Sequence, residues 1–200
     1  MKHKNHPLLA FEREARVNGY TIIAGVDEAG RGPLAGPVVA AACILPDNFF
    51  HPKLDDSKKL TPAIREALFP ILTALPHGVG IVSHEEIDHL NIYQATIKAM
   101  EIAIASLPMK PDYLLVDGMK LKHEIANQKI IDGDALSHSI AAASVIAKVT
   151  RDRIMMRFHT LYPKYRFDRH KGYGTSDHRT AIKEHGLSPL HRKSFKSSEN

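Results

Sequence analysis

Four acidic residues share one kind of position in this sequence, where an apolar segment meets a glycine-containing turn or the start of a helix. They are Asp27, Glu28, Asp117 and Asp134. Acids at the ends of buried strands are costly unless they are paired or bind a cation, and strand ends are where α/β proteins commonly build their sites. Carboxylate oxygens without cysteine ligands favour Mg²⁺ or Mn²⁺. The pattern therefore predicts a divalent-metal site.

A cluster of this kind suits phosphodiester hydrolysis by two metal ions roughly 4 Å apart. One ion lowers the pKa of the attacking water, and the other stabilises the leaving oxygen. Each acid also has a plain structural interpretation. Asp134 could be the N-cap of the helix that follows it, and Asp117 with Gly118 could form an ordinary turn. Spacing alone leaves both interpretations open.

Strands and helices alternate along the segments that carry these acids. Apolar runs bounded by turn residues predict strands, and capping signals with helical periodicity predict helices. The pattern indicates a mixed α/β domain with helices packed on a partly parallel sheet. We expect one domain over 1–200, with an N-terminal extension over about 1–18 and a basic C-terminal segment over about 160–200. The predicted strands cover 21–28, 38–45, 78–83, 113–116 and 128–132, and the predicted helices 61–75, 83–107, 135–160 and 176–185.

Composition excludes several classes of protein. Hydrophobic residues make up 44% of the 200 residues, enough for a sizeable core. We expect no membrane association, because no apolar run approaches the roughly 20 residues needed to span a bilayer. The single cysteine, Cys43, excludes an internal disulfide and indicates a cytoplasmic protein. It lies in an apolar run, which favours a buried structural role.

Charge is unevenly distributed along the chain. From Lys148 to the end there are 13 Lys and Arg against 5 Asp and Glu, a net +8, whereas the first 147 residues carry 14 against 17. This basic region is either a solvated charged surface or a face that binds a polyanion. Composition does not separate the two.

Six motifs in order resemble those of one known family. Together they extend from Gly25 to Phe195 and resemble the motifs of ribonuclease HII, the type 2 ribonuclease H family. The motifs are GVDEAGRGPLAGPVVAAA at 25–42, DSKKL at 56–60, LLVDG at 114–118, GDALSHSIAAASVIAKVTRDR at 133–153, HKGYGTSDH at 170–178 and HRKSF at 191–195.

The resemblance implies a ribonuclease H-like fold, with a mixed five-stranded sheet flanked by helices and a helical C-terminal segment. It implies an endonuclease that hydrolyses the RNA strand of RNA–DNA hybrids. Cleavage would include the 5′ side of single ribonucleotides embedded in duplex DNA, leaving 3′-OH and 5′-phosphate. Asp27, Glu28, Asp117 and Asp134 fall on the family's metal-binding carboxylates, and the cofactor would be Mn²⁺ or Mg²⁺. We expect the protein to act as a monomer.

Two further motifs fall on the family's recognition residues. Gly30-Arg31-Gly32 falls on a loop that senses the ribonucleotide, where glycines let the backbone approach a 2′-OH. Tyr173 falls on a tyrosine that stacks at the junction with the next nucleotide. Without the resemblance, a tight turn with a solvated arginine and a loop tyrosine packed on the core would explain both.

Ser57, Lys58 and Lys148 are candidates for contacts with substrate phosphates, although Lys148 could equally be a surface residue. His170 either touches substrate or shapes its loop, and it is not included in the predicted site. Two rival functions remain. A nucleic-acid-binding module would hold a hybrid without metal and never cut it. A phosphatase for small molecules would not depend on a duplex and has no use for the basic C-terminal region.

Overall fold

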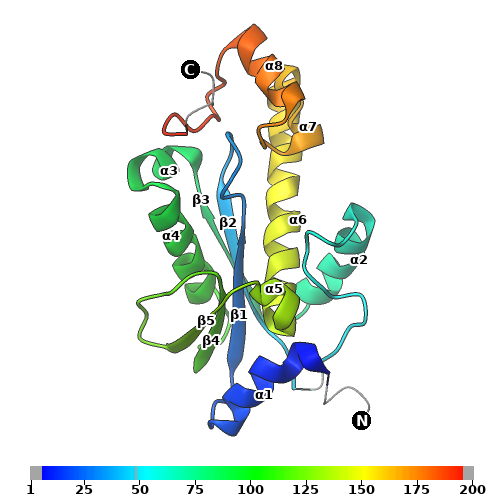
Figure 1. Cartoon of the computed structure of the whole chain (residues 1–200), viewed down its shortest axis with the longest axis vertical. Helices are drawn as coiled ribbons and strands as arrows, with labels where there is room; N and C mark the ends of the chain where they lie inside the picture. The colour runs from blue at the N-terminus through cyan, green and yellow to red at the C-terminus, as the bar shows by residue number, and fades with distance from the viewer. Residues whose placement is uncertain (1–5, 48, 196–200) are drawn as a thin grey trace.

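A computed structural model describes residues 6–47 and 49–195. Its centre is a five-stranded sheet in the order β3-β2-β1-β4-β5 (Figure 1). The first three strands pair antiparallel, and β4 and β5 continue the sheet parallel to β1. The predicted mixed five-stranded sheet is therefore confirmed. The strands are β1 (Ile23–Ala29), β2 (Val38–Ile44), β3 (His77–Val82), β4 (Tyr113–Asp117) and β5 (Ala126–Ile130).

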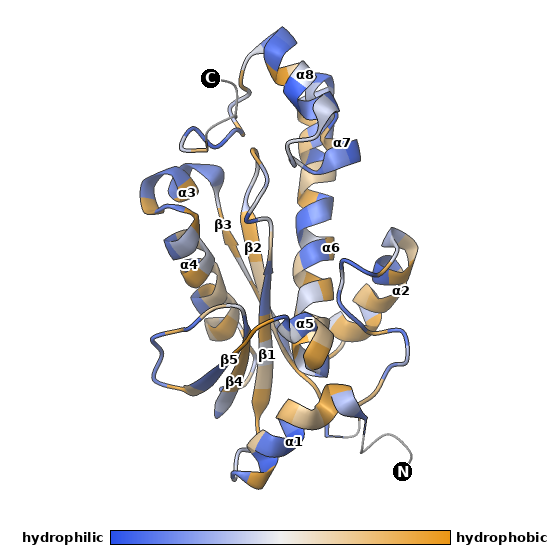
Figure 2. Cartoon of the chain, in the orientation of Figure 1, coloured by the Kyte–Doolittle hydropathy of each residue, from blue (hydrophilic) through white to orange (hydrophobic). Residues whose placement is uncertain are grey.

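Helices cover both faces of the sheet (Figure 1). One face packs on α3 (His84–Leu90) and α4 (Ile92–Ala105), and the other on α2 (Pro62–Thr73) and α6 (His138–Leu161). Strand β2 is apolar and buried along its whole length, as expected in a sheet covered on both sides, whereas the edge strand β5 is largely hydrophilic (Figure 2). The remaining helices are η1 (Pro7–Leu9), α1 (Ala10–Val17), α5 (Gly133–Leu136), η2 (Pro163–Tyr165), α7 (Phe167–His170) and α8 (Ser176–His185).

Capping residues begin two of the helices as predicted. The Thr61 side chain accepts a hydrogen bond from the Ile64 N–H, and Pro62 occupies the first turn of α2. Ser83 and Glu86 form a reciprocal capping box at the start of α3. Helix α8 has the predicted bounds, Ser176–His185.

Two predicted helices are each broken in two. The prediction of one helix over 83–107 is wrong, because Asn91 adopts φ +68° and its side chain caps α4 by accepting from the N–H groups of Tyr93 and Gln94. The prediction of one helix over 135–160 is also wrong. Ser137 is extended there and starts α6 by capping the Ile140 N–H. The apolar periodicity continues across both breaks, so it conceals them.

The predicted N-terminal extension contains a helix that packs onto the domain. Glu12 of α1 is buried, and its Oε1 accepts hydrogen bonds from the Ser137 and Ser139 hydroxyls and from the Ser139 N–H. A carboxylate at this position stabilises the N-terminus of α6. The segment 163–174, predicted as a loop, contains η2 and α7.

Glycine allows β1 to approach α6 closely. A Cβ on Gly25 would lie 2.1 Å from the backbone carbon of Ser139 and 2.3 Å from the Ile140 nitrogen. The start of α6 is thereby held against the strand that carries Asp27 and Glu28. Cys43 is fully buried, as predicted, and burial raises the pKa of its thiol to about 12. Within 6–47 and 49–195, the helices are all too short or too polar to cross a membrane.

We expect Gly25→Ala to lower the free energy of unfolding by more than about 3 kcal/mol, above the usual range for an overpacked core, because the opposing atoms are backbone. Gly186→Ala is the matched control. Gly186 has φ +72° and ψ −173°, a conformation that favours glycine, and no atom lies near a new Cβ, so that variant should lose only about 1–3 kcal/mol. Urea unfolding would measure both, and equal losses would contradict close packing at Gly25.

Candidate active site

Asp27 and Asp117 lie side by side at the carboxyl ends of two neighbouring parallel strands. Val26 of β1 is level with Val116 of β4, so the next residue of each strand is one of these two acids. Side chains alternate along a strand, so residues 25, 27, 115 and 117 share the face that packs on α6. Register alone therefore brings together two acids 90 positions apart.

Glu28 completes a group of three acids. One carboxylate oxygen from each of Asp27, Glu28 and Asp117 lies within 4.8 Å of the others. Glu28 Oε1 is 3.4 Å from the Arg31 guanidinium. Its Oε2 is buried and has no hydrogen-bond partner among the described residues. A buried oxygen without a donor is the arrangement expected where a ligand supplies the missing contact.

Asp134 is not one of the three acids whose oxygens lie within 4.8 Å of one another, but it adjoins them, and its charge acts on Asp117. Asp117 Oδ1 accepts a 2.6 Å hydrogen bond from the Gly133 N–H, which fixes the start of α5 next to the cluster. Asp134 is itself buried, and its Oδ2 lies 2.9 Å from the Lys58 Nζ. It occupies the first turn of α5, whereas the N-cap is Asp132. The structure thus brings all four predicted acids to one end of the sheet.

The cluster is electrostatically unfavourable as it stands. Burial, followed by the charges of Glu28 and Asp117, raises the pKa of Asp27 well above its ordinary value. Burial also raises the pKa of Glu28 against the opposing effect of Arg31, and it raises that of Asp117 against the Gly133 N–H. Each acid would therefore be stabilised by a cation placed between them.

The donor set fits a divalent metal ion. It consists of carboxylate oxygens alone, it includes the unpartnered Glu28 Oε2, and its charges repel one another. Hard cations such as Mg²⁺ and Mn²⁺ take oxygen ligands of this kind. Some loss of hydration lowers the pKa of Lys58, but the hydrogen bond and charge of Asp134 raise it above its ordinary value. A lysine ammonium therefore neutralises the fourth acid.

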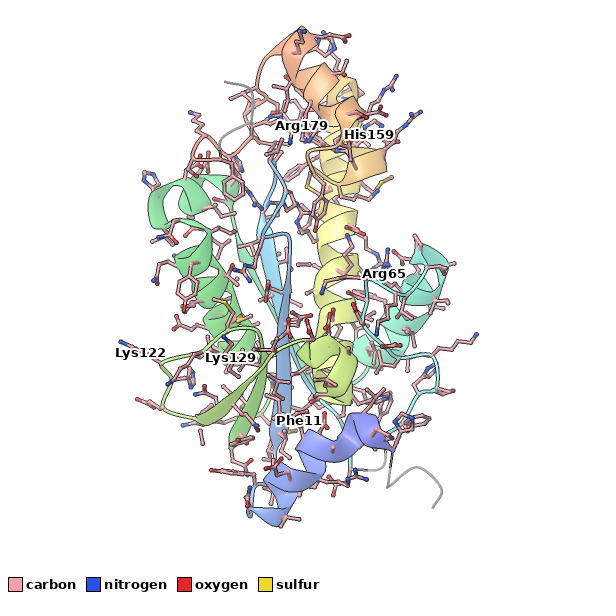
Figure 3. All side chains as sticks on the ribbon, in the orientation of Figure 1. Phe11, Arg65, Lys122, Lys129, His159 and Arg179 are labelled. Atoms are coloured by element: carbon pink, nitrogen blue, oxygen red, sulfur yellow. The ribbon has the colours of Figure 1, made fainter. Side chains whose placement is uncertain are left out.

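Ser57 lies in the protein interior next to the cluster, not on the surface. It is buried, and its hydroxyl is 2.7 Å from the Ser144 hydroxyl. Ser144 in turn bonds to Asp27 and lowers the pKa of that acid. Arg65 of α2 holds the loop in place by donating to the carbonyls of Ser57 and Leu60, and Figure 3 shows this arginine between α2 and α6. The DSKKL motif therefore contacts the acids in two ways. Ser57 acts from the protein interior through Ser144 and Asp27, and Lys58 bonds to Asp134.

Two buried arginines hold the segment that follows Glu28. Arg192 donates to the carbonyls of Gly30, Arg31, Gly36 and Pro37, at 2.6, 2.9, 2.9 and 3.2 Å. Arg151 donates to the carbonyls of Ala35, Pro37 and Lys171. Neither guanidinium forms an ion pair with an acid of the described chain. Burial lowers the pKa of Arg151 to about 10 and that of Arg192 to about 9, so both are charged at neutral pH.

These contacts set the orientation of the loop formed by Gly30, Arg31 and Gly32, hereafter the GRG loop. A trans peptide group points its C=O and the following N–H in opposite directions. Because the carbonyls of Gly30 and Arg31 point inward to Arg192, the N–H groups of Arg31 and Gly32 point away from it. Gly30 has φ +99°, and a Cβ there would lie 2.0 Å from the Arg151 Nε. Only glycine both adopts this positive φ freely and leaves room for the Arg151 side chain.

Sequence reasoning missed both arginines, because the basic C-terminal region was interpreted either as a solvated surface or as a polyanion-binding face. Arg151 and Arg192 are instead 0% and 2% exposed. Their positions in the TRDR and HRKSF motifs mark them within the resemblance, but one-dimensional sequence does not distinguish a buried arginine from an exposed one. Carbonyl oxygens replace the acids that would usually accompany a buried cation.

Tyr173 lies beside the GRG loop. A Cβ on Gly32 would be 3.7 Å from the Tyr173 Cε1, and the Leu34 N–H donates to the Gly172 carbonyl at 2.8 Å. The tyrosine ring is 40% exposed, so one surface of it is free to contact another molecule. Two residues predicted from separate motifs are thus adjacent in space.

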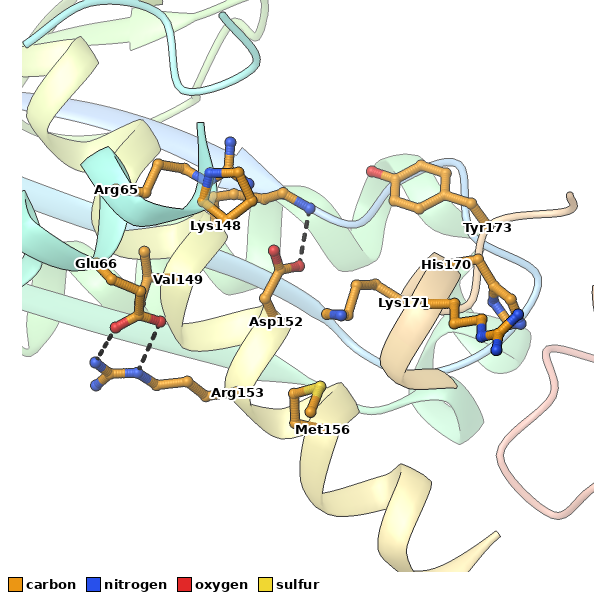
Figure 4. A pocket seen from close by; sticks show the side chains of 12 residues that line it. Arg65, Glu66, Lys148, Val149, Asp152, Arg153, Met156, His170, Lys171 and Tyr173 are labelled. Carbon is orange, nitrogen blue, oxygen red and sulfur yellow. Dashed lines mark hydrogen bonds and ion pairs between the residues drawn. The ribbon is translucent and has the colours of Figure 1, made fainter. Parts of the chain in front are cut away.

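A groove of about 440 Å³ extends from Tyr173 between α2, α6 and α7 (Figure 4). Lys148 lies in it, with its Nζ 2.8 Å from Asp152 and 5.7 Å from the centre of the Tyr173 ring. Lys148 and Asp152 thus form a half-buried ion pair. Other basic residues lining the groove are Arg65, Arg153, Arg169 and Lys171. The groove is thus mainly basic.

The fold and the acidic cluster define a nuclease domain of the ribonuclease H type. The ribonuclease H2 of Pyrococcus horikoshii OT3 superimposes with a TM-score of 0.74 at 29% identity, over 88% of this chain and 94% of that one. The ribonuclease HII in a PCNA complex from Archaeoglobus fulgidus gives 0.74 at 25% identity, over 90% and 98%.

The sequence comparison assigns the family. The family model described as Ribonuclease HII matches residues 24–198. The chain is 56% identical to the ribonuclease HII of Chlamydia pneumoniae over 94% of its length and 89% of the relative's. It is 54% identical to that of Syntrophus aciditrophicus, over 93% and 89%. The chain belongs to the ribonuclease HII family, and it is an endonuclease that degrades RNA in RNA–DNA hybrids in a divalent-metal-dependent reaction.

Removing a charge from the cluster should stabilise the metal-free protein. The raised pKa of Asp27 means that the folded state binds more protons than the unfolded state as the pH rises above 3.8, so stability falls through that window and the penalty persists at pH 7. We expect Asp27→Asn, measured with EDTA at pH 7, to raise the Tm by about 2–4 °C or more, the shift that about 1 kcal/mol produces at this chain length.

Asp112→Asn is the control of opposite sign. Some loss of hydration raises the pKa of the exposed Asp112, but hydrogen bonds from Thr21 and Ile22 lower it overall, so its charge stabilises the fold at pH 7. Its loss should lower the Tm. A lower Tm for Asp27→Asn as well would show that the cluster carries no net repulsion without metal.

Proposed function

We propose that the protein hydrolyses the phosphodiester on the 5′ side of a ribonucleotide, both in RNA–DNA hybrids and at a single ribonucleotide in duplex DNA. The products would carry 3′-OH and 5′-phosphate ends. The observation that supports this proposal is the adjacency of two sites. Glu28 belongs to the acid cluster, and the GRG loop begins two residues after it, with the Tyr173 ring beside the loop.

Asp27, Glu28, Asp117 and Asp134 would hold two divalent ions, Mg²⁺ or Mn²⁺. When bound, such ions supply an activated water and stabilise charge on the leaving oxygen. The protein's part is to hold these acids in place, through the contacts of Ser144 with Asp27, of the Gly133 N–H with Asp117 and of Lys58 with Asp134. No side chain is needed as a nucleophile, and the only cysteine is buried on the sheet.

The GRG loop would recognise the sugar of the ribonucleotide. The outward N–H groups of Arg31 and Gly32 can donate to a 2′-OH or a phosphate oxygen, and the absence of side chains on the glycines allows close approach. The 44% exposed side chain of Arg31 can add a charge-assisted bond to a phosphate. Tyr173 would stack on the sugar of the next nucleotide, where a deoxyribose fits more easily than a ribose.

The basic groove beside Tyr173 would hold the nucleic-acid backbone. Lys148 lies at its inner end, next to the tyrosine ring, and Lys58 lies beside Asp134. Both would contact phosphates near the cleaved bond. Ser57 would act indirectly, through Ser144 and Asp27, because its hydroxyl faces inward. We propose a monomer, since these sites come from one chain.

Asp117→Asn should reduce cleavage of a DNA duplex with one embedded ribonucleotide at least about 100-fold, because even an outer partner of a metal ligand costs about 10–100-fold. Single-turnover rates with Mg²⁺ or Mn²⁺ would measure this. Asp132→Asn is the control, since this exposed acid is near the cluster and asparagine tolerates its φ of +53°. If Asp117→Asn cuts at the parental rate, the assigned metal site is wrong.

Tyr173→Ala should reduce cutting at a single ribonucleotide about 10-fold, as expected from a lost stacking interaction, while binding to the same duplex without metal changes less. Tyr93→Ala on α4 removes a comparably exposed tyrosine from the opposite side of the sheet and should change neither quantity. Equal losses of cutting and binding in Tyr173→Ala would argue against the junction-sensing role.

A further inference from the structure

Three buried groups form a chain of hydrogen bonds that ends on the backbone of Tyr173. The Tyr173 carbonyl lies 3.0 Å from the Nδ1 of His178, a residue of α8. The Nε2 of His178 lies 3.1 Å from the Nε2 of His191. The Nδ1 of His191 accepts a 2.9 Å hydrogen bond from the Ser188 N–H. His178 and His191 are 0% and 2% exposed.

The direction of every hydrogen bond in this chain follows from its two ends. The Ser188 N–H can only donate, so Nδ1 of His191 is the acceptor of that 2.9 Å bond and its proton is on Nε2. The Ser188 hydroxyl, 2.8 Å away, can donate to the same Nδ1, and the Ser188 carbonyl lies farther off at 3.3 Å. The Tyr173 carbonyl can only accept, so Nδ1 of His178 carries the proton and its Nε2 is the acceptor. The central contact is then His191 Nε2–H donating to His178 Nε2. In this arrangement both rings are neutral.

The surroundings keep both rings neutral and fixed. Burial, followed by the neighbouring charge of His170, lowers the pKa of His178 to about 4, and burial lowers that of His191 as well. The His178 ring stacks on that of His170, with centroids 4.3 Å apart, and meets Phe167 edge-on. Both ring nitrogens of His170 are hydrogen-bonded, Nε2 to the Tyr165 carbonyl and Nδ1 to the Gly172 N–H, so this residue shapes the loop.

Ser188 and His191 belong to a segment that also holds the GRG loop. The Arg192 N–H donates to the Leu34 carbonyl, and the Gly36 N–H donates to the Leu190 carbonyl, both at 2.9 Å. The Arg192 side chain bonds the carbonyls of Gly30 and Arg31. Residues 188–192 therefore contact the backbone of the GRG loop directly and that of Tyr173 through His178.

We propose that His178 and His191 are positioning residues that set the place of Tyr173 relative to the GRG loop, by linking the Tyr173 carbonyl to the segment 188–192. This proposal rests on the role proposed above for Tyr173. The link has a consequence for activity. Its loss should reduce kcat for cutting at a single ribonucleotide and leave KM nearly unchanged, because the tyrosine remains present but is misplaced.

Two substitutions of His178 separate this role from simple packing. His178→Asn retains a donor near the position of Nδ1 but loses volume, whereas His178→Phe fills the volume but has no donor. We expect His178→Phe to lose up to about 10-fold in kcat, because a residue that acts through Tyr173 should cost no more than removal of the Tyr173 ring, and His178→Asn to retain most of it despite a lower Tm. If His178→Phe cuts at the parental rate while His178→Asn is impaired, the ring serves only as packing and the proposal is overturned.

A double variant separates failure of this proposal from failure of the proposed function. In a Tyr173→Ala background, His178→Phe should cause less than about a 2-fold further loss, because residues that act through one another are not additive. If Tyr173→Ala alone cuts normally, the proposed sensing role fails, whatever His178 does. If Tyr173→Ala is impaired and His178→Phe adds its full effect to it, the positioning role fails while the sensing role stands.

His191 provides a second test should the His178 variants not fold. His191→Gln keeps a donor near Nε2, towards His178, whereas His191→Asn keeps an acceptor near Nδ1, towards Ser188. Transmission through His178 predicts a higher kcat for His191→Gln than for His191→Asn on the single-ribonucleotide duplex. The reverse order would mean that His191 only secures Ser188, and it would contradict the proposal.

Discussion

Repulsion among buried carboxylates is the constraint on which this structure depends. Asp27, Glu28 and Asp117 approach one another within 4.8 Å, and burial raises the pKa of each. They stay together because the pairing of the strands and the packing of α6 fix their positions. Parallel pairing of β1 with β4 sets two of them level, and Gly25 lets α6 press against the strand beneath them. The fold thus supplies the free energy that keeps a cation site assembled before any cation binds.

A second set of buried charges, of opposite sign, organises the recognition side. Arg151 and Arg192 have backbone carbonyls as partners in place of acids, and those carbonyls belong mainly to residues 30–37. A loop that must present its N–H groups outward needs its carbonyls turned inward, and a buried guanidinium with several donors does this. The histidine link extends the same support to Tyr173.

Local sequence predicted most of the elements, because each depended on neighbouring residues. Five strands are recognisable as apolar runs between turn residues, and Thr61, Ser83 and Glu86 signal helix starts that the structure contains. Prediction failed where a local signal competed with periodicity. Asn91 and Ser137 each cap a new helix within a continuous apolar pattern. Helix α1 went unrecognised, because the contact that secures it joins Glu12 to Ser139, 127 residues away.

The sequence by itself determined which acids stand at strand ends, the order of the motifs and the identity of the family they resemble. These are properties of residue type and spacing. Only the tertiary structure decided which basic residues face solvent, that Ser57 turns inward to Ser144, and that Tyr173 lies against Gly32. The physical reason is that burial and hydrogen-bond partners are set by contacts between distant segments. Arg192 and Gly30 are 162 residues apart, and no local pattern records their hydrogen bond.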